Sequence, residues 1–198
     1  MHKLFVTQIY QASIKTNLRD LSKEIRQIEQ ADHAGREWSL ANYKNGFTSY
    51  SSMDQLQRMS STFELLEKKI AVHVGAFAKN LDFEIRKKEL KMNSMWANIM
   101  PAGSLHTSHL HPHSVISGTY YVEVPLRASA IKFEDPRLGL FMNAPTVKAK
   151  ARKENLRFFS VQPKPQDLVL FESWLKHEVP LNQSQKPRIS ISFNYGWA

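Results

Sequence analysis

The second half of the chain is a series of short apolar segments separated by turn residues, and this pattern constrains the fold most. Strands are predicted over residues 95–100, 115–124, 130–133, 156–161, 167–171 and 188–195. Short strands with turns between them are typical of sandwiches and barrels, whereas alternating strands and helices would indicate a parallel sheet. We therefore expect a mainly β structure in this half.

The first half has helical periodicity. A first helix is predicted to begin after Asn17, a suitable N-cap, and to end near Gly35. A second helix is predicted to begin at Ser61, with Glu64 completing a capping box. Between the two helices, residues 37–60 show weak periodicity of either kind, so we expect a long loop.

The size and composition of the chain suit one domain. The chain has 198 residues, of which 42% are hydrophobic, and this is enough for one full-sized core. It has no apolar run of about 18 residues and no evident signal peptide, so we expect a cytoplasmic protein without a membrane contact. The absence of cysteine excludes disulfides, thiolate metal sites and a cysteine nucleophile. Histidine, aspartate and glutamate are left as metal ligands.

The chain is basic, with a formal net charge of +9. Lysine and arginine concentrate in residues 86–91 and 148–153. Such runs are most often solvated surface, although they also suit a polyanionic partner. Binding of nucleic acid is therefore kept as a less favoured alternative.

Half of the eight histidines fall within residues 106–113. If this segment is an extended strand, His109, His111 and His113 project from one side at intervals of roughly 6.6 Å, and His106 lies outside their register. An H-x-H pair on a strand can supply half of a metal site. The competing interpretation is a run of solvated histidines near a turn.

Two later features can complete such a site. His177 is the remaining histidine after the cluster, at the end of an apolar strand, and is the natural third ligand. The final strand alternates strictly, with Arg188, Ser190, Ser192 and Asn194 on one side and Ile189, Ile191, Phe193 and Tyr195 on the other. It is either a half-exposed strand or one whose polar side lines a cavity, where an arginine could bind a carboxylate.

These residues carry a family resemblance. In order and spacing, His109-x-His111, a distal His177 and Arg188-x-Ser190 resemble the site of the iron(II)/2-oxoglutarate-dependent oxygenases. More narrowly, about residues 92–195 resemble a bacterial and phage group of these oxygenases with unassigned substrate. The motifs of this group are His111-Pro-x-Ser, Ile116-Ser-Gly-Thr-Tyr-Tyr-Val122, Phe133-x-Asp-Pro-Arg137, Leu170-Phe-x-Ser-Trp174 and Arg188-Ile-Ser-Ile-Ser-Phe-Asn194.

The resemblance implies a fold and an activity. The fold would be mainly β with α, a double-stranded β-helix of jelly-roll or cupin type with the N-terminal helices packed outside. Residues 1–90 would form a helical support region with one N-terminal strand over residues 3–14, and residues 91–198 the β-helix core, all within one domain. The activity would be hydroxylation of an unknown primary substrate by O₂, with decarboxylation of 2-oxoglutarate to succinate.

The resemblance also implies roles for single residues. His109 and His177 would bind iron(II) as the first and the distal ligand, and His111, at the position of the family's second ligand, would complete the metal site. Arg188 and Ser190 would hold the far carboxylate of 2-oxoglutarate. Two weaker matches to residues that contact the cosubstrate are Asn98 and Tyr121.

One departure from the family pattern leaves alternatives open. Where the family has a carboxylate ligand two residues after the first histidine, this chain has His111, so the metal site would be one charge unit more positive. The ligand pair could instead be His111 and His113. A metal-binding, cupin-like protein that holds a small acid without turnover is a second functional hypothesis. The sequence predicts neither the primary substrate nor the oligomeric state.

Overall fold

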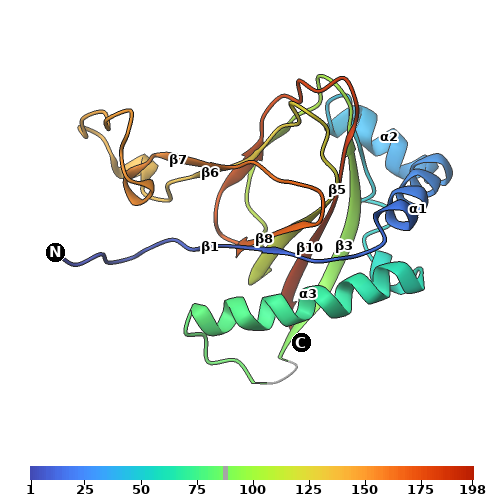
Figure 1. Cartoon of the computed structure of the whole chain (residues 1–198), viewed down its shortest axis with the longest axis horizontal. Helices are drawn as coiled ribbons and strands as arrows, with labels where there is room; N and C mark the ends of the chain where they lie inside the picture. Colours follow the sequence, from blue (N-terminus) through green and yellow to red (C-terminus); the bar gives the residue numbers. More distant parts are fainter. Residues whose placement is uncertain (87–88) are drawn as a thin grey trace.

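The strands of the protein form two antiparallel sheets. The computed structural model describes residues 1–86 and 89–198. Its strands are β1 (Ile9–Ser13), β2 (Phe47–Thr48), β3 (Leu90–Met100), β4 (His106–His109), β5 (Ile116–Glu123), β6 (Ile131–Glu134), β7 (Phe158–Val161), β8 (Asp167–Glu172), β9 (His177–Val179) and β10 (Arg188–Trp197). The major sheet has six strands in the order β1-β8-β5-β10-β3-β2, and the minor sheet has four in the order β4-β9-β6-β7. Together they form the flattened barrel in Figure 1.

Helices cover the outer face of the major sheet (Figure 1). They are α1 (Leu18–Ala31), α2 (His33–Asn42) and α3 (Ser61–Asn80), with short 3-10 turns η1 (Leu56–Arg58), η2 (Leu138–Leu140) and η3 (Lys153–Asn155). One continuous core joins the helices to the sheet, and includes Leu21 and Ile25 of α1, Phe63 and Ile70 of α3, and Ile189, Ile191 and Phe193 of β10. None of the helices in the described ranges is both long enough and apolar enough to span a bilayer.

The central strands are buried on both faces. In β8, Leu168 and Leu170 point into the core beneath the helices, whereas Val169 and Phe171 belong to a second core between the two sheets. The sequence of a strand that is covered on both sides is a continuous apolar run. The apolar segment predicted over residues 167–171 is therefore a central strand.

The first helix begins where the sequence predicts and ends earlier. The side chain of Asn17 accepts hydrogen bonds from the backbone N–H groups of Arg19 and Asp20. The predicted end near Gly35 is wrong, since α1 stops at Ala31 and α2 follows after Asp32, whose side chain accepts from Gly35 N at 2.8 Å. The predicted loop over residues 37–60 is wrong at its start because α2 continues to Asn42. In α2 the buried residues are Gly35 and Ser39, so the helix has no apolar stripe by which to detect it.

The cap of the second helix is displaced by one residue. The N-cap of α3 is Ser60, whose hydroxyl accepts from Phe63 N, and Ser61 is the first helical residue. The predicted capping box at Ser61 is therefore wrong, although Glu64 does lie in the first turn.

Two strand predictions are also wrong. The strand expected over residues 3–14 is limited to β1. The segment 106–113 is not one strand, because β4 ends at His109 and His113 adopts a left-handed backbone with φ of 64°. His109, His111 and His113 therefore do not share one side of a strand.

Candidate metal centre

A cavity lies between the two sheets and contains most of the residues predicted for the site. It is lined by His109, His111 and His177, and also by Arg188 and Ser190, which are almost fully buried. The polar side of β10 therefore faces the cavity, while its apolar side is buried in the core beneath the helices. The alternative interpretation of β10 as a half-exposed strand is wrong.

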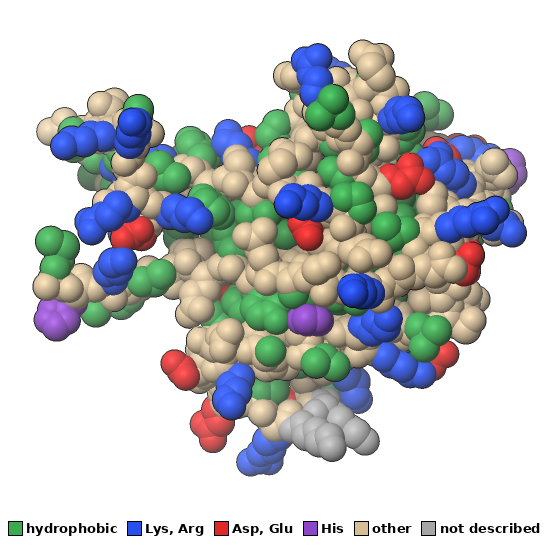
Figure 2. Space-filling model, in the orientation of Figure 1, with side chains coloured by type: hydrophobic (Ala, Val, Ile, Leu, Met, Phe, Trp, Pro, Cys, Tyr) green, Lys and Arg blue, Asp and Glu red, His purple; other side chains and the backbone are tan. Residues whose placement is uncertain are grey.

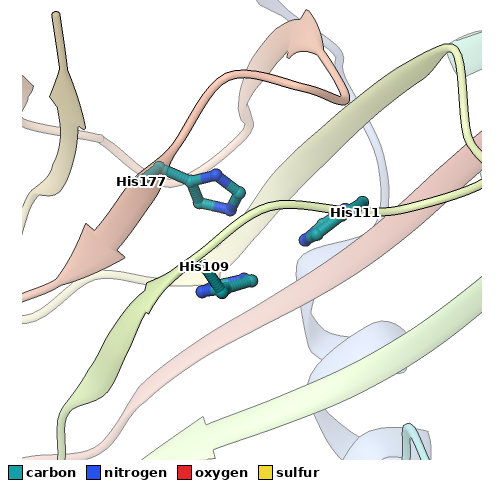
Figure 3. Close-up of side chains that lie close together, drawn as sticks. All are labelled: His109, His111 and His177. Atoms are coloured by element: carbon teal, nitrogen blue, oxygen red, sulfur yellow. The ribbon is translucent and has the colours of Figure 1, made fainter. Parts of the chain in front are cut away.

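Three histidines converge at one point. The potential ligand nitrogens of His109, His111 and His177 lie within 4.8 Å of one another, and Figure 3 shows the three side chains around a common space. His109 and His177 are cross-strand partners in the minor sheet. His111 follows β4, and its backbone N–H donates to the carbonyl of Ser173 at 2.9 Å. The chain thus brings together residues that are far apart in the sequence.

Backbone carbonyls orient two of the rings. The Nδ1–H of His109 donates to the carbonyl of Thr107 at 2.8 Å, and that of His177 to the carbonyl of Leu175 at 2.9 Å. A carbonyl oxygen only accepts hydrogen bonds, so Nδ1 must carry the proton in both rings. The lone pair of each Nε2 is then free to bind a metal ion.

A polar side-chain network orients the third ring. Nδ1 of His111 donates to Oδ1 of Asn194 at 2.7 Å and lies 2.8 Å from the hydroxyl of Ser117. The hydroxyl of Ser117 is also 2.7 Å from that of Ser173 and from Oδ1 of Asn194. His111 is therefore held in the same tautomer as the other two histidines, by a partner on the polar side of β10.

Burial keeps these imidazoles neutral. Loss of solvation, together with the neighbouring imidazoles, lowers the pKa of His177 to about 2 and that of His111 to about 4. Burial also lowers the pKa of His109. Neutral imidazole is the form that binds metal ions, so at neutral pH the three rings are in the protonation state that a metal site would need.

Arg188 is a buried cation without a counterion. Its side chain is 2% exposed, and its Nη1 donates to Sδ of Met100 and to the hydroxyl of Ser190, each at 3.3 Å. Within residues 1–86 and 89–198, Nε of Arg188 has no hydrogen-bond partner and no acidic group forms an ion pair with Arg188. A buried, unpaired charge is costly, so this end of the cavity suits an anionic ligand.

The other predicted cosubstrate residues lie beside Arg188. Asn98 lines the cavity and donates to the hydroxyl of Ser192 at 3.1 Å. Tyr121 lies beneath Arg188, whose guanidinium carbon is 4.9 Å from the centre of the tyrosine ring. The hydroxyl of Tyr121 is buried and has no hydrogen-bond partner in the part of the chain that the structure describes, and burial raises its pKa.

The structure adds residues that the sequence did not indicate. His106 lines the cavity and stacks on His109 with ring centres 4.1 Å apart, because the pairing of β4 with β9 is irregular between these two residues. Burial lowers the pKa of His106 to about 3. Tyr43, at the end of α2, packs edge-on against His106 at 5.1 Å, and burial raises its pKa to about 12. His113 is exposed and does not belong to the group, so the alternative pair of His111 and His113 is not found.

Several solved structures share the fold of this chain at low sequence identity to it. They include the non-heme alpha ketoglutarate dependent epimerase SnoN from nogalamycin biosynthesis (TM-score 0.66, 14% identity, 97% of this chain and 77% of that one). A prolyl-4-hydroxylase from Pseudomonas putida has a TM-score of 0.62 at 13% identity, covering 97% and 94% of the two chains. HygX from Streptomyces hygroscopicus, solved with nickel and 2-oxoglutarate, has a TM-score of 0.63 at 11% identity, covering 98% and 84%. These similarities confirm the double-stranded β-helix.

The sequence itself identifies the family. No curated protein matches the chain. A family model described as "Putative 2OG-Fe(II) oxygenase" matches residues 94–194, slightly more than half of the chain. The matched segment contains the three converging histidines and Arg188. The chain therefore belongs to this family of 2-oxoglutarate and iron(II)-dependent oxygenases.

Proposed function

We propose that this protein is a dioxygenase that hydroxylates its primary substrate, with His109, His111 and His177 as the iron(II) ligands. Arg188 and Ser190 hold the far carboxylate of 2-oxoglutarate. The observation that carries the proposal is one cavity that contains three oriented imidazoles and a buried cation without a counterion in the described ranges.

Each residue of the cavity has a separate task in this proposal. When bound, iron(II) and 2-oxoglutarate supply the oxidative chemistry, in which O₂ is consumed, 2-oxoglutarate becomes succinate and an oxygen atom enters a C–H bond. The Nδ1 hydrogen bonds hold the three rings so that Nε2 faces the ion. The guanidinium of Arg188 offers parallel N–H donors to a carboxylate.

Two further residues support the cosubstrate. Asn98 lies on β3 directly across from Ser190 on β10, within the same cavity, and its amide can reach the cosubstrate. Tyr121 places its ring against the guanidinium of Arg188 and thereby limits the positions of that side chain.

The third histidine favours one alternative. His111 is neutral where the family pattern has a carboxylate, so the bound metal keeps one more unit of positive charge. A cupin-like protein that binds a metal and a small acid without turnover would use the same residues. The nucleic-acid-binding module without metal chemistry is less favoured, because it gives no role to the buried histidines.

Measurement of succinate release separates the oxygenase from the non-catalytic alternative. Purified protein loaded anaerobically with iron(II) should release succinate from 2-oxoglutarate when O₂ is admitted, and His109→Ala and His177→Ala should abolish this release. Exposed His33→Ala is the matched control. Tight binding of metal and 2-oxoglutarate with no succinate from any candidate substrate would favour the non-catalytic alternative.

We also propose that the chain is a single domain, with residues 1–90 supporting a core of residues 91–198. Support comes from the shared core of helices and major sheet. The solved epimerase and hydroxylase share the fold, so the substrate is not indicated by architecture. The cytoplasmic location stays a prediction from the sequence.

A further inference from the structure

The connection between β6 and β7, residues 135–157, leaves the barrel as a basic projection. It carries six basic side chains and two acidic ones. Figure 1 shows it as the orange loop at the left, and Figure 2 shows lysine and arginine side chains gathered on the same projection. The other basic run, residues 86–91, includes Lys87 and Lys88, which lie outside the described residues. The projection is therefore the basic feature whose structure is described in full.

A cleft in this projection is lined by cations. Its charged lining residues are Arg137, Lys148, Lys150, Arg152 and Arg157, and none of the residues lining it is acidic. Arg137 is paired with Asp135 through bonds of 2.9 and 3.0 Å, and Arg152 lies 3.9 Å from Glu154.

The remaining cations of the cleft are open to a ligand. Lys148, Lys150 and Arg157 form no ion pair with the described acidic groups. A groove of this kind attracts an extended anion, and most strongly one with a charge at every repeat.

An aromatic ring lies within the cleft. Phe141 lines it, with the guanidinium carbon of Arg157 at 3.6 Å from the ring centre and that of Arg137 at 5.5 Å. Leu140 and Met142 on either side are 75% and 94% exposed. Cations combined with a half-buried aromatic ring and exposed apolar neighbours suit a strand of nucleotides, because phosphates bind the cations and bases stack on the ring. An acidic peptide would use the cations alone.

The projection begins at the end of the barrel that holds the three histidines. Phe133 on β6 is the cross-strand partner of His177. Two residues later, Asp135 N donates to the carbonyl of Arg157 at 2.8 Å and closes the base of the projection. A polymer held in the cleft would therefore lie at the same end of the barrel as the metal site.

We infer that the cleft of residues 137–157 binds the phosphate backbone of single-stranded nucleic acid and tethers it at this end of the barrel. Binding itself does not depend on the oxygenase reaction. The further step, that the tethered strand is the substrate, rests on the proposed function.

The test is binding of a fluorescent 20-nucleotide single strand, measured by anisotropy from 50 to 200 mM salt without iron or 2-oxoglutarate. The cleft variant is Lys148→Glu, Lys150→Glu and Arg157→Glu together. The matched control reverses Lys23, Lys79 and Arg19, which are exposed on α1 and α3, and has the same net charge. The cleft variant should raise the Kd at 50 mM salt roughly tenfold or more and reduce the salt slope by about 2, since each phosphate contact to a single strand contributes about 0.7. The control should retain most of the affinity.

Substitution of the stacking residue gives a second test, because attraction by charge alone would not depend on Phe141. Phe141→Ser should weaken binding roughly fivefold or more with an unchanged salt slope. Equal losses in the two triple variants would overturn the inference, because the attraction would then come from the overall charge. Displacement of the strand by poly-glutamate of equal charge, as effectively as by unlabelled oligonucleotide, would overturn it in favour of an acidic protein partner. Because the assay contains no metal, failure of binding leaves the proposed oxygenase function untouched.

Discussion

Arg188 carries a positive charge that no acidic side chain in the described ranges balances. It is fully enclosed by the barrel, with Met100 and Ser190 as its hydrogen-bond partners. Such a residue costs stability in the absence of a ligand, and natural proteins accept this cost where a ligand supplies the missing charge. Its contributions to stability and to binding should therefore have opposite signs.

Arg188→Met tests this opposition. The variant should raise the Kd for 2-oxoglutarate at least about 100-fold, because two charge-assisted hydrogen bonds are lost. It should also raise the free energy of unfolding of the ligand-free protein by about 1 kcal/mol. Isothermal titration and urea denaturation measure the two effects. Lys186→Met removes an exposed charge two residues away and should change neither; a destabilised Arg188→Met with unchanged affinity would contradict the role of Arg188.

Asn194 should influence the metal without touching it. Its Oδ1 accepts from Nδ1 of His111 and fixes the tautomer of that ring. Asn194→Leu removes the acceptor and should weaken metal binding about 10- to 100-fold while the fold is retained. Competition with a chelator measures the affinity. Asn194→Asp keeps the acceptor, so this variant should retain most of the wild-type metal affinity. Equal affinities of the wild type and both variants would show that the tautomer is fixed by other groups.

The sequence predicted the residues of this site unevenly. His109, His111 and His177 could be named because their residue type and order resemble a known pattern, and the structure brings them together. His106 was excluded by its register, since an irregularity in β4 turns it into the cavity. Tyr43 carried no signal, because it reaches the site from the end of a helix that lacks an apolar stripe. The order of residues in a motif is enough to predict the three histidines. The other residues that line the cavity depend on a β-bulge and on packing, which the sequence does not show.

At the scale of elements, the packing of side chains from two neighbouring strands over β5 depends on a residue without a side chain. Gly118 on β5 is packed so that a Cβ atom would lie 2.5 Å from Phe193 and 2.6 Å from Leu170. Gly118→Ala should therefore lower the free energy of unfolding by about 1–3 kcal/mol through overpacking. At Gly75 in α3 a Cβ atom would meet no described atom within 4 Å apart from its chain neighbours and the helix's own backbone, so Gly75→Ala should raise stability by about 0.5–1 kcal/mol. Urea denaturation measures the free energy of unfolding of both variants. Equal changes in the two variants would contradict the packing argument.

The elements themselves were predictable where burial leaves a pattern. Strand β10 alternates because one face lines a cavity and the other packs under the helices, and α3 shows a stripe because Phe63, Leu66 and Ile70 face the core. Strand β9 was missed because three residues are too few for a period, and β4 was expected only as part of a longer strand over residues 106–113. Their positions follow from pairing with each other, which is a long-range contact.

At the scale of the whole molecule, one buried and three half-buried imidazoles in the barrel link folding to pH. In the folded protein burial lowers the pKa to about 2 for His177, about 3 for His106 and about 4 for His111. In the unfolded chain their pKa values return to about 6.5. Between about pH 4 and 6.5 the unfolded state therefore binds more protons than the folded state, so stability must rise with pH in this window. Below the folded pKa values both states are protonated, and above about 6.5 neither is, so these groups add no pH dependence there.

This linkage gives a prediction for the metal-free protein. Each imidazole that stays neutral in the fold contributes a slope of about 1.4 kcal/mol per pH unit, so chelator-treated protein should lose several kcal/mol of unfolding free energy between pH 6.5 and 5. Urea denaturation across this range measures the slope. His106→Gln removes one imidazole outside the ligand triad and should make the slope shallower by about one proton, while exposed His2→Gln should leave it unchanged. A flat profile in wild-type protein would mean that the imidazoles become protonated without unfolding, and the dry cavity on which the metal site depends would then be wrong.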